Sequence, residues 1–101
     1  MARPKRAEWL NTALLELYEV AAYIQQEFGT EVAQAFLTAA YETAEQLLQY
    51  PEIGRPITRY KTVRYVHVGK HHRMYYRAHG SVLYLLFLFD ERKDPSANRY
   101  R

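Results

Sequence analysis

The hydrophobic pattern of this chain changes its period at a short turn-rich segment, residues 51–56 (P-E-I-G-R-P). Before this segment, apolar residues recur every three or four positions, which is the spacing of one face of a helix. After it, the pattern alternates with a period of two, as in strands. A chain of 101 residues, 49% of them hydrophobic, is large enough for one core. The sequence therefore predicts a single α+β domain over residues 1–101.

Two helices are expected before residue 51. The first covers residues 10–28 and ends at Gly29, which accepts the left-handed backbone that often follows a helix. The second starts at residue 30 and ends at Tyr50, because the residue before a proline avoids helical geometry. The apolar stripe of the first helix consists of Leu10, Leu14, Leu17, Ala21, Ile24 and Phe28. The short connection predicts an antiparallel helical hairpin.

Three strands are expected in the second half, at residues 62–68, 71–79 and 82–89, with turns at Gly69-Lys70 and Gly80-Ser81. Residues 82–89 are apolar at every position, which predicts a strand that is covered on both faces. Residues 5–9 are a candidate edge strand. The predicted order is β-α-α-β-β-β, with the helical hairpin packed on a small antiparallel sheet.

The charge of the chain is divided between its halves. Residues 1–50 contain three Lys or Arg and seven Glu, whereas residues 51–101 contain eleven Lys or Arg and four acidic residues. This asymmetry indicates an acidic or polyanionic partner for the second half.

The absence of cysteine excludes disulfides and thiolate metal sites. No apolar run is long enough to predict a membrane helix or a signal peptide, so we expect a cytoplasmic protein without a membrane partner.

The strand at residues 71–79 contains the main candidate binding surface. Its alternation separates His72, Met74, Tyr76 and Ala78, which are expected to face the helices, from Arg73, Tyr75, Arg77 and His79. Guanidinium and ring groups in one row suit contacts with phosphates, carboxylates or exposed bases. The alternative is that a solvated sheet face is simply rich in Arg and Tyr. Arg64 on the neighbouring strand and Arg92 after the last strand are expected on the same side of the sheet as Arg73. The predicted target-binding set consists of Arg64, Arg73, Tyr75, Arg77 and Arg92.

Other features give further expectations. The spacing of His67, His71 and His72 does not bring them together as metal ligands, and Asp90 and Glu91 are expected to pair with Arg92 and Lys93. We therefore predict no metal and no cofactor.

Several apolar residues of the helices lie outside the core stripes and predict a surface for a partner segment: Tyr18, Ala22, Tyr23, Val32 and Tyr41.

Several motifs, in this order and spacing, resemble a known family. They are Trp9–Leu17, the segment 51–56, the strand motif Arg73-Met-Tyr-Tyr76, and the ending Asp90-Glu-Arg-Lys-Asp-Pro95. Together they are similar, nearly end to end, to the RelE/ParE superfamily of bacterial type II toxin–antitoxin toxins. The resemblance implies a growth-inhibiting toxin of a plasmid-stabilisation type of system. It also implies a hetero-oligomer with a cognate antitoxin that keeps the toxin inactive.

The superfamily contains two mechanisms. RelE-like members cleave mRNA in the ribosome without a metal, whereas ParE-like members inhibit DNA gyrase. Arg73 and Arg92 match the RelE-like arginines, but Asn98 falls at the position of the catalytic tyrosine and Tyr100 comes two residues later. If the chain is a ribonuclease, its catalytic residues are expected to be Arg73, Arg92 and Tyr100. The D-x-R-x-D-P ending favours the ParE-like mechanism, and an inactive member that only binds its antitoxin and acts as a co-repressor is a third alternative.

Overall fold

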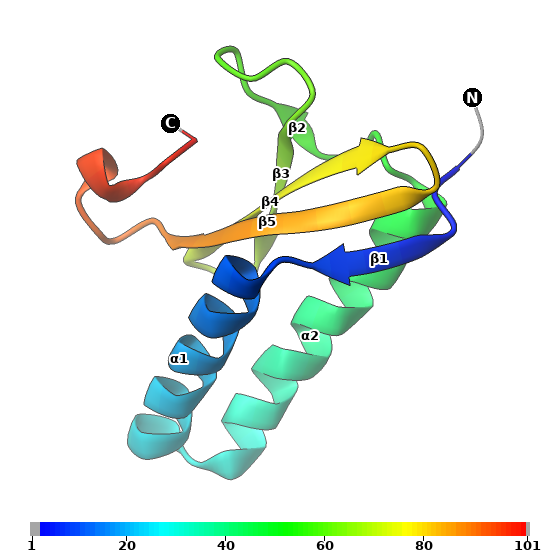
Figure 1. Cartoon of the computed structure of the whole chain (residues 1–101). Coiled ribbons are helices and arrows are strands. Elements are labelled where there is room, and N and C mark those ends of the chain that lie inside the picture. The colour runs from blue at the N-terminus through cyan, green and yellow to red at the C-terminus, as the bar shows by residue number, and fades with distance from the viewer. Residues whose placement is uncertain (1–2, 101) are drawn as a thin grey trace.

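The computed structural model describes residues 3–100 and confirms the predicted α+β architecture (Figure 1). Two helices form a hairpin and the strands form one sheet beside it. A short strand, β2, joins the sheet in addition to the four that the sequence predicts. The elements are β1 (Arg6–Trp9), α1 (Asn11–Phe28), α2 (Thr30–Gln49), β2 (Arg55–Pro56), β3 (Arg64–Val68), β4 (His72–His79), β5 (Val82–Asp90) and a 3-10 turn at Pro95–Ala97.

The sheet has the order β1-β5-β4-β3-β2. Tight turns connect β3, β4 and β5, so these strands are antiparallel, as predicted. The candidate strand at residues 5–9 is confirmed as the edge strand β1, but it pairs with β5 in parallel, so the sheet is mixed. Along the chain, the helical hairpin lies between β1 and the other strands. A connection of this length does not impose the antiparallel pairing that a tight turn between two strands imposes.

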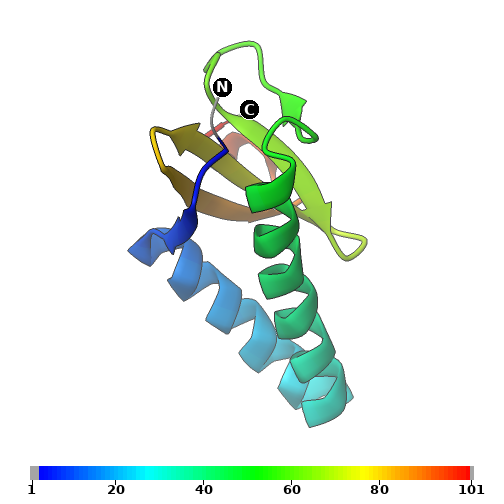
Figure 2. The same ribbon diagram turned by 90° about the vertical axis from the view of Figure 1, so that its right-hand side faces the viewer.

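The helical hairpin covers one face of the sheet. Its two helices splay toward the sheet and meet at a tip that projects away from it (Figure 2). The core between the layers contains fully buried side chains of both helices, Leu17 of the predicted stripe and Leu47 of α2, against Met74, Leu83 and Leu85. The tip has no sheet to cover it, and Phe28 therefore remains 66% exposed.

Two side chains of α1 continue the hydrogen bonding of β5 where β1 ends. β1 pairs only with residues 82–85 of β5. Beyond them, the Thr12 hydroxyl donates to the Leu86 carbonyl (3.0 Å), and Glu16 accepts from the Leu88 amide (3.0 Å). Burial raises the pKa of the Glu16 carboxyl above its ordinary value. These bonds satisfy backbone groups that an open strand edge leaves unpaired.

Candidate functional site

The face of the sheet opposite the helices carries a second core, which we call the aromatic layer. It consists of Tyr65, Tyr75, Phe87 and Phe89 from the strands, together with Tyr60 and Tyr100. The rings of Tyr75 and Tyr100 are stacked with their centroids 5.1 Å apart. Tyr75 is fully buried as a result. The expectation that Tyr75 belongs to a solvated row is therefore wrong, because the C-terminal segment folds back across this face.

Hydrogen bonds fix the C-terminal segment on the aromatic layer. Asn98 is buried and donates through Nδ2 to the Tyr75 hydroxyl (2.8 Å), while its Oδ1 accepts from the Tyr100 amide (2.9 Å). Asp94 starts the preceding 3-10 turn by accepting from the Ser96 amide (2.9 Å). Sequence reasoning missed the role of Asn98. The Asp94-Pro95 pair was the available signal, since Asp followed by Pro is typical of the start of a helical turn.

Arg73 lies on the predicted face, but its guanidinium is engaged within the protein. Its Nε donates to Glu91 Oε2 (2.7 Å), and its Cζ lies 4.3 Å from the centroid of the Tyr65 ring. Glu91 also contacts His67 Nε2 (3.0 Å). The hydrogen bond from Arg73 lowers the pKa of the Glu91 carboxyl. Arg73 therefore connects β3, β4 and the turn after β5, and its charge is largely balanced by Glu91.

Arg92 follows β5 and forms a two-pronged pair with Asp90. Its Nε and Nη2 donate to the two carboxylate oxygens at 3.0 and 2.8 Å, and its amide donates to Asp90 at 2.9 Å. These bonds lower the pKa of Asp90 to about 2. The predicted pairing of Asp90 with Arg92 is confirmed. The Arg92 side chain remains 57% exposed, so its outer edge is open to solvent.

Arg64 lies on the other face of the sheet from Arg73. It is directly opposite Tyr76 in the ladder of β3 and β4, and its Nη1 donates to the Gly54 carbonyl (2.8 Å) and the Glu52 carbonyl (3.3 Å). The expectation that Arg64 shares the face of Arg73 is therefore wrong. Alternation with Val66 and Val68, which are both in contact with the helix-side core, explains its position.

Tyr76, the last residue of the Arg73-Met-Tyr-Tyr76 motif, has a structural role. Its ring belongs to the helix-side core, as predicted from alternation. Its hydroxyl donates to the Pro51 carbonyl (2.7 Å) and accepts from the Gly54 amide (2.9 Å). Burial raises the pKa of the Tyr76 phenol. The tyrosine of the R-M-Y-Y motif thus holds the segment 51–54 against the sheet.

The exposed cations around the aromatic layer form what we call the cationic rim. Arg77 is exposed on the same face of β4 as Arg73. Arg59 lies over the Tyr60 ring at 5.7 Å, and Arg99 lies over the Phe87 ring at 5.6 Å. Sequence reasoning did not select Arg59 or Arg99 for this surface. The rim consists of Arg59, Arg77 and Arg99, and it suits contacts with carboxylates or phosphates on a macromolecular surface. Arg92 is not part of it, because Asp90, which holds its guanidinium, lies opposite His72 on the helix side of the sheet. The expectation that Arg92 lies on the same side as Arg73 is therefore wrong.

Two kinds of feature are absent from residues 3–100. No group of three or more His, Asp or Glu side chains in this part of the chain is arranged to hold a metal ion. None of the helices in the same part combines the length and the apolarity that a membrane crossing requires.

Comparison with known proteins identifies the family. The model of the ParE toxin of the type II toxin–antitoxin system parDE matches residues 7–95. A solved chain of a "Chromosomal ParDE TA system from P. aeruginosa" is 17% identical and superimposes with a TM-score of 0.72, covering 87% of this chain and 96% of that chain. No curated protein matches the sequence. The family match over nearly the whole domain, together with the shared fold, shows that this chain belongs to the ParE toxin family of type II toxin–antitoxin systems.

Proposed function

We propose that this protein inhibits DNA gyrase by binding it through the cationic rim, and that a cognate antitoxin neutralises it. The observation that carries the proposal is the internal pairing of both RelE-like arginines. Arg73 is bonded to Glu91 and Arg92 is bonded to Asp90. A protein that blocks its target needs a stable complementary surface, and such pairs make a surface rigid without assembling a reaction centre.

Metal-free cleavage of RNA makes stricter demands. A group must take the proton of the 2′-hydroxyl, and unpaired cations must converge on the phosphate as its charge develops. In this structure Glu91 balances Arg73, and the Tyr100 ring is stacked on Tyr75 as part of a core. These contacts support binding over RNA cleavage, which remains the second candidate.

The surface of the helical hairpin supports the proposal that an antitoxin binds this protein. Its exposed apolar residues include Leu15 (65% exposed), Tyr18 (50%) and Tyr23 (56%), as the sequence predicts for Tyr18 and Tyr23. A groove of about 320 Å³ lies between the helices and is lined by Tyr18, Ala21, Ala22, Gln25, Thr30, Ala33, Gln34 and Leu37. Such a groove suits the apolar face of a partner helix. We infer that an antitoxin helix lies in this hairpin groove.

The substitution Tyr100→Phe separates the two mechanisms. This substitution keeps the ring that stacks on Tyr75 but removes its hydroxyl group. We expect growth inhibition in cells to be unchanged within about twofold, because the proposed contact with gyrase does not use this hydroxyl. A ribonuclease that uses Tyr100 for proton transfer is expected to lose about 10²–10⁴-fold of its activity. Loss of toxicity in a variant with an unchanged melting temperature would contradict the gyrase mechanism.

A further inference from the structure

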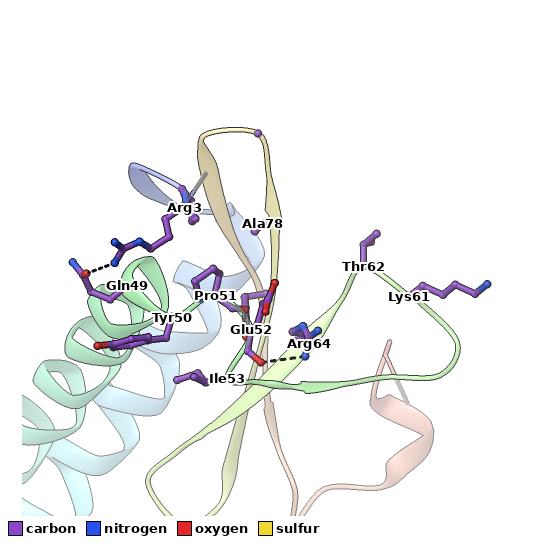
Figure 3. Close-up of a pocket in the computed structure, with 13 residues that line it drawn as sticks. Arg3, Gln49, Tyr50, Pro51, Glu52, Ile53, Lys61, Thr62, Arg64 and Ala78 are labelled. Carbon is purple, nitrogen blue, oxygen red and sulfur yellow. Dashed lines mark hydrogen bonds between the residues drawn. The ribbon is translucent and has the colours of Figure 1, made fainter. Parts of the chain in front are cut away.

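A cavity lies beside the C-terminal end of α2, and no part of the proposed function uses it. It has a volume of about 650 Å³ and lies between the N-terminal segment, the turn after α2 and the start of β3 (Figure 3). Its lining residues are Arg3, Pro4, Gln49, Tyr50, Pro51, Glu52, Ile53, Lys61, Thr62, Arg64, Tyr76, Ala78 and Gly80. We call this cavity the α2-end pocket.

The apolar part of the pocket is exposed. Tyr50 is 61% exposed and Ile53 is 54% exposed, and Figure 3 shows them side by side with Pro51. Large apolar side chains at this exposure, inside a hollow, form a surface that a bulky apolar group of a partner can cover.

The charged part of the pocket selects for an anion. Arg3, Lys61 and Arg64 line it, against the single acid Glu52. Nη1 of Arg64 is fixed by the carbonyls of Gly54 and Glu52, whereas Nε and Nη2 have no partner within residues 3–100. A guanidinium that is already held in place loses little conformational freedom when it binds a carboxylate. Arg3 and Lys61 lie at opposite sides of the pocket in Figure 3, so an extended chain with several acids suits it better than a small ion.

The pocket and the hairpin groove lie along one helix. The groove is lined by Thr30, Ala33 and Leu37 of α2, and the pocket is lined by Gln49 and Tyr50 at the end of the same helix. A helix of 20 residues is about 30 Å long, so a partner chain that follows α2 reaches both. The helices α1 and α2 contain six Glu and no Lys or Arg, so they repel an acidic segment, whereas the pocket attracts one.

We propose that the α2-end pocket receives an extended acidic segment of the antitoxin, next to the helix that lies in the hairpin groove. A bulky apolar side chain of this segment covers Tyr50 and Ile53, and a carboxylate of the same segment binds Arg64. Arg3 and Lys61 attract its other acids. This inference rests on the proposed antitoxin partnership and adds a second, chemically different contact to it.

The test measures the affinity of the purified protein for the protein that the neighbouring gene encodes. Lys61→Glu is expected to weaken binding about tenfold at about 0.15 M salt, and the loss should disappear near 1 M salt. Ile53→Asp, which places an acid on an exposed apolar residue, should weaken binding by a similar factor without disturbing the fold. Glu52→Gln should strengthen binding severalfold, because it removes the only acid of the pocket.

Lys70→Glu is the matched control. Lys70 is exposed in the turn between β3 and β4, outside the pocket, and its substitution changes the net charge equally. It should change the affinity by less than about twofold. Equal losses from Lys61→Glu and Lys70→Glu, or no loss from Ile53→Asp, would overturn the pocket proposal alone. If the wild-type protein forms no complex, the antitoxin partnership itself fails and the pocket proposal fails with it.

Discussion

Gly54→Ala is expected to destabilise the protein by about 3–5 kcal/mol, because the cost of overpacking adds to the loss of one buried and one partly buried hydrogen bond. A Cβ atom at this position would lie 2.6 Å from Cε1 and 2.9 Å from Cζ of Tyr76, and would overlap its hydroxyl. The Tyr76 ring is buried and cannot move aside without losing the bonds to Gly54 and Pro51. Urea unfolding followed by circular dichroism measures the change.

Two controls isolate the clash at Gly54. Gly69 has a left-handed backbone (φ +67), and a Cβ atom added there would meet open space. Gly69→Ala should therefore cost only about 1–2 kcal/mol, which is the backbone strain alone. Tyr76→Phe removes the hydroxyl and should make Gly54→Ala less costly in the double variant than in the wild-type background. A cost for Gly54→Ala that does not exceed that of Gly69→Ala would mean that Tyr76 does not hold the segment 51–54.

Ala22→Glu is expected to weaken antitoxin binding about a hundredfold, which corresponds to about 2.7 kcal/mol. Ala22 is exposed on α1 and lines the hairpin groove. A glutamate there places an unpaired charge under the apolar face of the partner helix, and burial of an unpaired charge is strongly unfavourable. Isothermal titration with the purified antitoxin measures the affinity, and cells that carry both proteins should lose protection from the toxin.

Ala35→Glu is the matched substitution for Ala22→Glu. Ala35 is an exposed alanine of α2 that does not line the groove, and the same change there adds the same charge. We expect its effect on affinity to stay below about threefold. Similar losses from the two substitutions would show that the antitoxin does not use the hairpin groove.

The elements with strong periodicity were predictable from sequence. The stripes of α1 and α2 and the apolar run of β5 predict the hairpin and a central strand, and the structure places β5 between β1 and β4 with a core on each face. The direction of β1 was not predictable, because its pairing with β5 depends on how the helices return the chain. The position of Arg64 was predictable from its alternation with Val66 and Val68.

The candidate site was less predictable, because long-range contacts determine it. Tyr75 has the alternation of an outward residue, and only the returning C-terminal segment with Asn98 and Tyr100 buries it. Arg73 has the pattern of a free surface cation, but Glu91, which is 18 residues away, engages it. A sequence pattern reports which face a side chain takes, but it does not report which distant segment covers that face.

The most direct test of the proposed function is a DNA supercoiling assay with purified gyrase and the purified protein, beside a translation-coupled mRNA cleavage assay. We expect the protein to inhibit supercoiling and to leave mRNA intact. Substitution of Arg77 and Arg99 by Glu should reduce the inhibition at least about tenfold, because charge reversal replaces attraction in the cationic rim with repulsion. Cleavage of ribosome-bound mRNA, with supercoiling unaffected at a large excess of the protein, would contradict the gyrase mechanism.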